Sequence, residues 1–340
     1  MPVRIRGCGA WRMVAALACA AVVCAGCGRS PAASGAAGGK VRVATTVAPI
    51  TSIVAAVGGD RVDITGVVPE GTNSHTFEPK PSVAELLATV DVVFVNGLGL
   101  EEPTTDLARA DKKGGAEIVE LGTKAIRPGD YIFDSSFPMS RGKPNPHLWT
   151  DPKYADSYAR TVRDTLVRRD VRNAAYYQAN YETFSATVAQ LDRAMRQAFA
   201  TIPDGRRTLL TYHDAYAYFA ADYGWRVVGA IQVSDFEDPT PREVAGLIDQ
   251  VRAEGVPAIF GSEVFPSPVL EQIARETGAA YVADLRDDDL PGRPGTRGHS
   301  WLGLVRFDSI TMTKALGGDA SALEAVALDT GVPDTAAYPQ

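Results

Sequence analysis

The feature that most restricts the fold of this chain is an alternation of short β-branched runs with segments of helical periodicity. The run Asp91–Asn96 is apolar between its two polar ends, as expected for a strand buried on both faces. The predicted strands are Val41–Thr46, Val62–Val68, Asp91–Asn96 and Glu117–Leu121 in the first half, and Thr208–Tyr212, Arg226–Ile231, Ala258–Phe260 and Ala280–Ala283 in the second. Parallel neighbours need crossover connections, which helices supply. The alternation therefore predicts an α/β fold with mainly parallel sheets flanked by helices.

A long helix is predicted between the two α/β halves. No proline or glycine occurs from Asn173 to Ala200, and apolar residues recur there at steps of three and four. At 1.5 Å per residue this helix is about 40 Å long. We predict two lobes with separate cores, joined by this rigid helix. The expected boundaries are a first lobe at 40–165, a linking helix region at 166–204, a second lobe at 205–320 and a C-terminal tail at 321–340.

The N-terminus has the pattern of an export signal. Three arginines precede an uncharged run, Met13–Gly26, which ends in small residues before Cys27. A membrane-spanning helix needs about 20 apolar residues, and this run is shorter. The end of the run is similar to a bacterial lipobox, so we predict a signal peptide at 1–27 and lipidation of Cys27. Residues 30–39 are small, and we predict that residues 28–39 form a flexible tether. Ordinary secretion is the alternative.

Cysteine placement and net charge exclude several kinds of site and partner. All four cysteines lie in the leader, so the folded part has neither a disulfide nor a thiolate metal site. Removal of residues 1–26 takes away three arginines and no acid, which changes the formal net charge from −7 to −10. So acidic a surface argues against a nucleic-acid partner.

Three of the four histidines in the chain follow predicted strands. His75, His147 and His213 lie past the carboxyl ends of strands or in the loops beyond, where ligands bind in open α/β sheets. The acidic run Asp287–Asp289 follows the last strand. Three imidazoles and one carboxylate form a four-coordinate set that suits Zn²⁺. Taken singly, each histidine could equally cap a helix or lie on a surface loop, and three aspartates in a row often form a solvated turn. His299 is interpreted as a polar turn residue without a ligand role.

Four ordered motifs make the chain resemble the solute-binding proteins of zinc and manganese ABC transporters, from Val41 to about Leu316. They are His75-Thr-Phe-Glu-Pro79 with Asn96–Glu101, Asn145–Pro152, His213–Phe219, and Phe260–Glu263 with Glu276–Gly278 and the aspartates that follow. The resemblance implies a metal held between two lobes by His75, His147, His213 and one aspartate. Asp287 aligns best with the fourth ligand, and Asp288 is the next candidate.

The same resemblance implies where the protein works and with what partner. It implies an exported, monomeric protein that is not an enzyme and that hands its metal to the membrane permease of an ABC transporter. Its place is the outer face of the cytoplasmic membrane, as a lipoprotein anchored through Cys27, or the periplasm. Glu263, at a strand end, is expected to support a ligand histidine without binding the metal.

The chain departs from the family pattern near two of these ligands and in one loop. Ser74 stands where proline is usual, and we expect it to alter only the local turn. Arg286-Asp-Asp-Asp-Leu290 stands where the family reads Asp-Pro-Leu or Asp-Ser. The loop 128–146 lacks a His-rich tract but keeps Asp130 and Asp134. Two interpretations of this loop are possible: it has a weak auxiliary role, or it is a mobile flap.

The ligand types favour zinc as the metal. Similar proteins that carry manganese often have glutamate where this chain has His213, and imidazole suits Zn²⁺ better than Mn²⁺. A zinc-dependent hydrolase is the main alternative function, because three protein ligands would leave a coordination position for water. Neither His-Glu-x-x-His nor Gly-x-Ser-x-Gly occurs in the chain. A manganese-binding member and a surface adhesin of the same family are further alternatives.

Overall fold

Two parallel four-stranded sheets form the framework of the protein. The structure is a computed structural model, which describes residues 39–231, 239–262, 264 and 267–340. The first sheet has the order β2-β1-β3-β4 and the second has β6-β5-β7-β8. The strands are β1 Val41–Thr45, β2 Val62–Gly66, β3 Val92–Val95, β4 Glu117–Glu120, β5 Thr208–Thr211, β6 Arg226–Ala230, β7 Ala258–Ser262 and β8 Ala280–Leu285. Every strand pair is parallel. The predicted fold class is confirmed, and both sheets use the same strand order.

Helices connect the strands and cover the sheets. They are α1 Ala48–Gly58, α2 Pro81–Leu87, α3 Glu102–Asp111, α4 Leu121–Ala125, α5 Pro152–Arg169, α6 Ala174–Phe199, α7 Ala217–Tyr223, α8 Pro241–Glu254, α9 Pro268–Thr277, α10 Trp301–Ala315 and α11 Ser321–Glu324. Proline in the first turn begins α2, α5, α8 and α9, because a helix leaves that amide without a partner anyway. Asp151 caps α5, and its carboxylate accepts a hydrogen bond from the amide of Lys153 at 2.9 Å.

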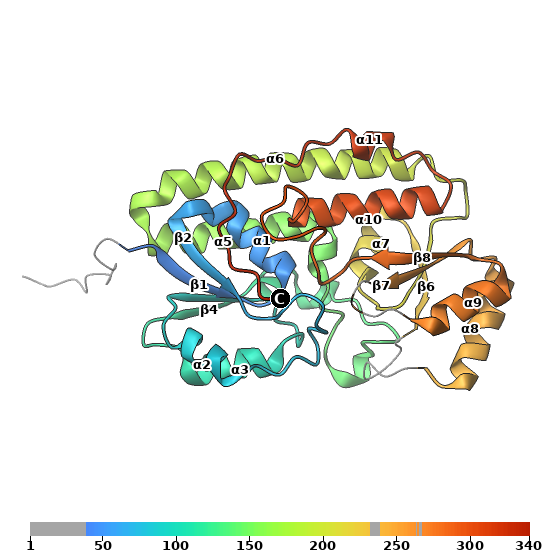
Figure 1. Cartoon of the computed structure of the whole chain (residues 1–340), viewed down its shortest axis with the longest axis horizontal. Coiled ribbons are helices and arrows are strands. Elements are labelled where there is room, and N and C mark those ends of the chain that lie inside the picture. Colours follow the sequence, from blue (N-terminus) through green and yellow to red (C-terminus); the bar gives the residue numbers. More distant parts are fainter. Residues whose placement is uncertain (1–38, 232–238, 263, 265–266) are drawn as a thin grey trace, which may run out of the picture. The chain divides into compact units, whose positions relative to one another are not determined.

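The predicted long helix is α6, with 26 residues and a length of about 39 Å. Its buried face includes Tyr177, Phe184 and Leu191. These residues recur at the spacing of one helix face. The helix packs against α1 and α5 and against α10 and α11 (Figure 1). It therefore links segments from both halves of the chain.

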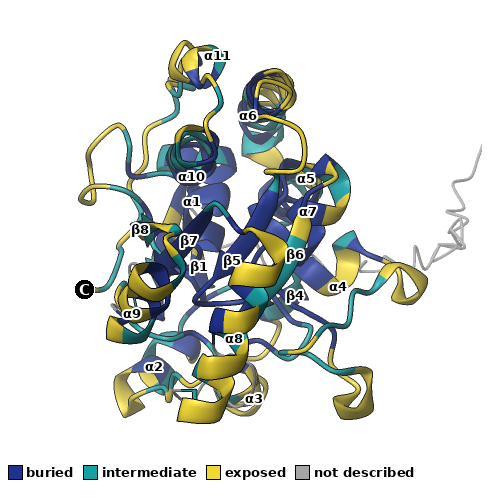
Figure 2. Ribbon diagram, turned by 90° about the vertical axis from the view of Figure 1, so that its right-hand side faces the viewer, coloured by how far each residue is buried: buried dark blue, intermediate teal, exposed yellow. Residues whose placement is uncertain are grey.

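The hydrophobic core differs from the expectation of two separate cores. One continuous cluster of buried residues includes Phe94 of β3 and Phe260 of β7, together with Trp149 and Trp301. Smaller clusters lie under α2 and α3 and under α8 and α9, on the other face of each sheet. Figure 2 shows the buried residues gathered in the strands and the exposed ones on outer helices such as α8. The expectation was wrong because α5, α6 and α10 bring their apolar side chains into the same space, which merges the two cores.

The C-terminal segment returns to the first sheet. The amide of Ala337 donates to the carbonyl of Ile64 at 2.9 Å, and the amide of Gly66 donates to the carbonyl of Ala337 at 2.9 Å. These bonds form a parallel bridge on the free edge of β2. The segment expected to be a tail therefore contains α11 and then extends the first sheet.

Several sequence-based expectations lie outside the described residues. These are the leader 1–27 with Cys27, the tether up to residue 38, and Glu263. Within the described part, no helix has the length and apolar character needed to cross a membrane.

Candidate metal centre

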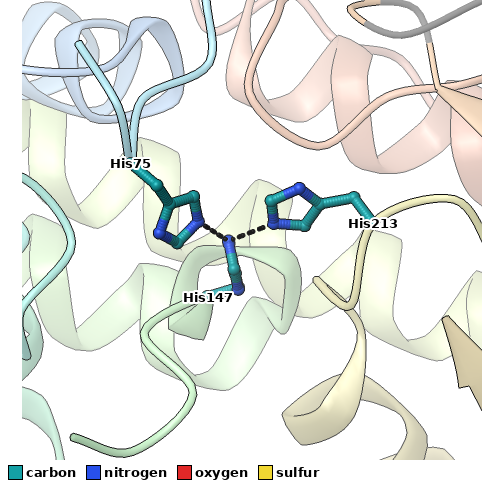
Figure 3. A group of neighbouring side chains, drawn as sticks. All are labelled: His75, His147 and His213. Carbon is teal, nitrogen blue, oxygen red and sulfur yellow. Dashed lines mark hydrogen bonds between the residues drawn. The ribbon is translucent and has the colours of Figure 1, made fainter. Parts of the chain in front are cut away.

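Three histidine rings from distant parts of the chain converge on one point. His75 lies in the loop after β2, His147 precedes the short 3-10 turn Leu148–Thr150, and His213 follows β5 directly. The Nε2 atoms of His75 and His213 lie 3.0 Å and 2.9 Å from Nε2 of His147 (Figure 3). One ring nitrogen from each residue falls within 4.8 Å of the others. Among the described residues, this is the one group of three or more potential metal ligands.

Burial keeps the three rings neutral. His147 and His213 are 0% and 4% exposed, and His75 is partly exposed. Desolvation lowers the pKa of His213 to about 4. Desolvation, followed by the nearby charge of His213, holds the pKa of His75 and of His147 well below the usual range. A neutral imidazole offers a lone pair, whereas a protonated one repels a cation. The rings are therefore in the form that binds metal near pH 7.

Asn145 determines which nitrogen of His147 faces the other rings. The Asn145 amide nitrogen donates to Oδ2 of Asp134 at 2.9 Å and to the carbonyl of Asp214 at 2.8 Å. Both partners accept here, so the Oδ1 atom of Asn145 must be the one facing His147 Nδ1, at 2.9 Å. His147 therefore carries its proton on Nδ1, and the lone pair of Nε2 faces His75 and His213.

A buried carboxyl group supports the segment before His147. Glu101 is 2% exposed and accepts hydrogen bonds from the amide of Asn96 at 2.5 Å and from Oγ1 of Thr46 at 2.8 Å. Burial raises the pKa of Glu101 to about 7, although the hydrogen bonds oppose this rise. The side-chain amide of Asn96 donates to the carbonyl of Pro146 at 2.9 Å. The loop after β3 thus holds the backbone immediately before His147.

The aspartate run lies beside the histidine group. Oδ2 of Asp287 is 3.8 Å from Nδ1 of His213, and the Asp287 carbonyl accepts a hydrogen bond from Nε1 of Trp149 at 2.8 Å. Asp287 lies on the Nδ1 side of His213 and is not part of the group of ring nitrogens. Asp288 instead accepts a hydrogen bond from Oγ of Ser74 at 2.6 Å. The expectation that Ser74 would alter only its own turn is therefore wrong, because its hydroxyl reaches the opposite half of the chain.

The loop 128–146 covers the histidines. The ring of Phe137 lies 5.7 Å, centroid to centroid, from the rings of both His75 and His147. The amide of Asn145 donates to the carbonyl of Ile132 at 2.9 Å, which closes the base of the loop. Beside His75 there is a cavity of about 500 Å³ that this loop helps to line. Sequence reasoning missed Phe137, because a lone aromatic residue in a long loop carries no motif.

His299 lies apart from the group, as expected, but its surroundings differ from a polar turn. It is 3% exposed, its ring packs against that of Tyr338 at 4.7 Å, and its Nε2 atom lies 3.8 Å from Oε2 of Glu70. The glycine-rich sequence around His299 predicted exposure, but the returning C-terminal segment covers the ring.

Comparisons with known proteins agree with this architecture. Residues 43–315 match the family model described as "Zinc-uptake complex component A periplasmic". The manganese-binding lipoprotein MntA of Halalkalibacterium halodurans is 26% identical over 297 residues, which cover 87% of this chain and 95% of the relative. The iron-binding protein YfeA of Yersinia pestis is 27% identical over 280 residues, covering 82% and 87%.

Solved structures show the same fold. The periplasmic zinc binding protein TroA of Treponema pallidum aligns with a TM-score of 0.73 at 23% identity, covering 82% of this chain and 99% of that one. The relatives named as lipoproteins and the periplasmic family confirm the predicted export. The chain belongs to the family described as zinc-uptake complex component A, and it is a metal-binding substrate-binding protein of the ABC-transporter type and not an enzyme.

Proposed function

We propose that the cargo of this protein is Zn²⁺, held by His75, His147, His213 and Asp287. The observation that carries the proposal is the convergence of three neutral imidazoles through their Nε2 atoms. Zinc–nitrogen bonds of about 2.0–2.1 Å place the nitrogens of a tetrahedral site about 3.3 Å apart. The two distances from Nε2 of His147, 3.0 Å and 2.9 Å, are a few tenths of an ångström shorter than this separation.

Asp287 is the proposed fourth ligand. Its carboxylate borders His213, and an aspartate oxygen completes a closed four-coordinate site, which suits an ion that is carried and not used for catalysis. The carboxylate also neutralises half of the ionic charge in a buried place. Asp288 is the weaker candidate because its Oδ2 atom is already engaged with Ser74, which leaves only its Oδ1 atom for a metal. Asp287→Ala should therefore weaken zinc binding more than Asp288→Ala does.

Manganese is the second candidate cargo, and the names of relatives favour it. Curated relatives are described as manganese-binding or iron-binding, and one solved structure is described as zinc binding. The imidazole of His213 supports zinc, because Mn²⁺ prefers carboxylate oxygen. Any nitrogen site binds Zn²⁺ more tightly than Mn²⁺ in vitro, so affinity alone does not identify the cargo. The deciding measurement is growth of a strain lacking this gene in metal-depleted medium. Rescue by zinc supports the proposal, and rescue by manganese alone contradicts it.

The ligand assignment has a direct test in the purified chain. His213→Ala should weaken zinc binding by several orders of magnitude in a chelator competition, because it removes one of four bonds to the ion. His299→Ala is the matched control, since it removes the one histidine outside the group. Equal zinc affinities for these two variants would exclude His213 from the site.

We also propose that the mature chain is anchored by lipid at Cys27 and delivers zinc, as a monomer, to the permease of an ABC transporter. The lipobox-like end of the leader and the relatives named as lipoproteins support this. Cys27→Ser should release the protein from the membrane fraction. A variant that stays in the membrane fraction would contradict lipid anchoring at this residue.

A further inference from the structure

Two of the three places where this chain departs from the family pattern contact each other. Ser74 precedes His75, and Asp288 follows Asp287, so each is the neighbour of a proposed ligand. Oγ of Ser74 donates to Oδ2 of Asp288 at 2.6 Å. The two residues are 214 positions apart in the chain, and they are 1% and 6% exposed. Water therefore does not compete for this bond, and the residues meet only because the fold joins the two halves.

Two further hydrogen bonds lie beside this contact. The amide of Gly71 donates to Oδ2 of Asp289 at 2.7 Å, and the amide of Leu290 donates to Oε1 of Glu70 at 3.1 Å. All three bonds join the turn 70–75 to the turn 286–290. The Ser74 bond is the one that is buried on both sides and directly adjacent to the ligands.

We propose that the Ser74–Asp288 hydrogen bond is a latch that sets how long the metal stays bound. The inference rests on the proposed function, in which His75 and Asp287 hold the same ion. The ion can leave only when ligands from the two turns separate, and that separation stretches the Ser74–Asp288 bond. Ser74 and Asp288 are thus positioning residues, which touch no metal themselves.

The latch predicts a specific kinetic signature. A buried hydrogen bond to a carboxylate is strong enough that its loss should speed release about 10- to 100-fold. Association should change less than release, because the ion enters while the two turns are apart and the Ser74–Asp288 bond is not made. Ser74→Ala is the most informative variant, since it removes the hydroxyl without changing the charge near the ion. A residue with a merely structural role would not separate the release rate from the association rate in this way.

The first experiment follows Zn²⁺ release from the loaded full chain after mixing with excess chelator. Ser74→Ala should release zinc about 10- to 100-fold faster than the wild type. Thr76→Ala is the matched control, because it removes an exposed hydroxyl from the same turn. Asp288→Asn keeps an oxygen that accepts from Ser74, so it should release zinc more slowly than Asp288→Ala. When Ser74 is already alanine, Asp288→Asn and Asp288→Ala should release zinc at more similar rates, because the hydrogen bond that distinguishes them is absent. Equal release rates for Ser74→Ala and Thr76→Ala would overturn the latch.

A second readout works without metal, so that a failure of the latch is distinguishable from a failure of the zinc proposal. Amide hydrogen exchange at Gly71 and Leu290 should speed up in Ser74→Ala and stay at the wild-type rate in Thr76→Ala. If the wild type retains no zinc, the cargo proposal fails while this exchange pattern still reports on the latch. If zinc binds normally and neither release nor exchange responds to Ser74→Ala, the latch alone is wrong. A cooperative thermal unfolding transition in both variants confirms that folded proteins are compared.

Discussion

Replacing Asn145 by alanine tests how the orientation of His147 is maintained. The side chain is 0% exposed and makes four hydrogen bonds. Its oxygen accepts from Nδ1 of His147 at 2.9 Å and from the backbone amide of His147 at 3.1 Å, and its amide nitrogen donates to Asp134 at 2.9 Å and to the Asp214 carbonyl at 2.8 Å. The substitution leaves the Nδ1 proton of His147 buried without its acceptor, which costs about 1–3 kcal/mol. Most of this cost lowers the stability of the fold. Metal binding is affected only insofar as the His147 ring loses its orientation. Removing such a supporting partner typically lowers metal affinity about 10- to 100-fold.

The assay is a chelator competition for Zn²⁺, paired with urea unfolding of the metal-free chain. Asn145→Ala should lose both affinity and stability. Asn180→Ala is the control for stability alone. Asn180, on α6, is also buried, and it donates to the carbonyl of Val57 at 3.0 Å. It should lower the free energy of unfolding and leave zinc affinity unchanged.

A second substitution separates the acceptor role of Asn145 from its donor role. Asn145→Asp keeps an oxygen for His147 but cannot donate to Asp134 or to the Asp214 carbonyl, and it adds a charge beside Asp134. Zinc affinity should therefore be largely retained while stability falls. If Asn145→Ala binds zinc as tightly as the wild type, the orientation of His147 does not depend on this contact and the reasoning is wrong.

Three further changes test other parts of the structure. Glu101→Gln should lower the free energy of unfolding by about 1–3 kcal/mol, because its amide would face backbone donors; equal stability in urea would contradict this. Zinc affinity should hold from pH 7 to about pH 5 and fall toward pH 4, because burial lowers the pKa of His213 to about 4 and only its neutral ring binds metal. A loss centred near pH 6.5 in chelator competition would show that the rings are solvated. Truncation after Pro333 should lower the free energy of unfolding by at least about 2 kcal/mol through the lost bonds of Ala337, and an unchanged urea midpoint would show that the segment contributes nothing.

The strands and the long helix were predictable because their signals are local. The helix α9, Pro268–Thr277, has local signals at both ends, since proline begins it and Gly278 ends it at a φ of 80°. The helix α10 was not predicted. Residues on most of its sides are buried, from Trp301 to Met312, so its sequence lacks the polar stripe of a surface helix.

The shared core shows a second limit of sequence reasoning. Periodicity reveals which face of an element is apolar, but it does not reveal the element that covers that face. Phe94 and Phe260 each belong to a recognisable buried strand, yet nothing in either strand indicates that they share one cluster. The return of Ala337 to β2 is equally non-local.

At the site, the three histidines were predictable from residue type and from their places after strands. Asn145 could also have been found, because an asparagine two residues before a proposed ligand histidine is placed to accept from its ring, as it does here. The contact of Ser74 with Asp288 has no local signal, since it depends on how two distant turns meet. Candidate metal ligands could therefore be predicted from residue type and position, whereas a contact between two distant turns could not.

Metal transport by this chain requires a single ion bound where the three rings meet. Crystals of the zinc-loaded chain, measured on both sides of the zinc absorption edge, test this without prior assumptions about the ligands. The expected result is one strong anomalous peak about 2.0–2.1 Å from Nε2 of His75, His147 and His213, with an oxygen of Asp287 as the fourth neighbour. A peak held by other residues, or zinc bound without these three rings, would contradict the account.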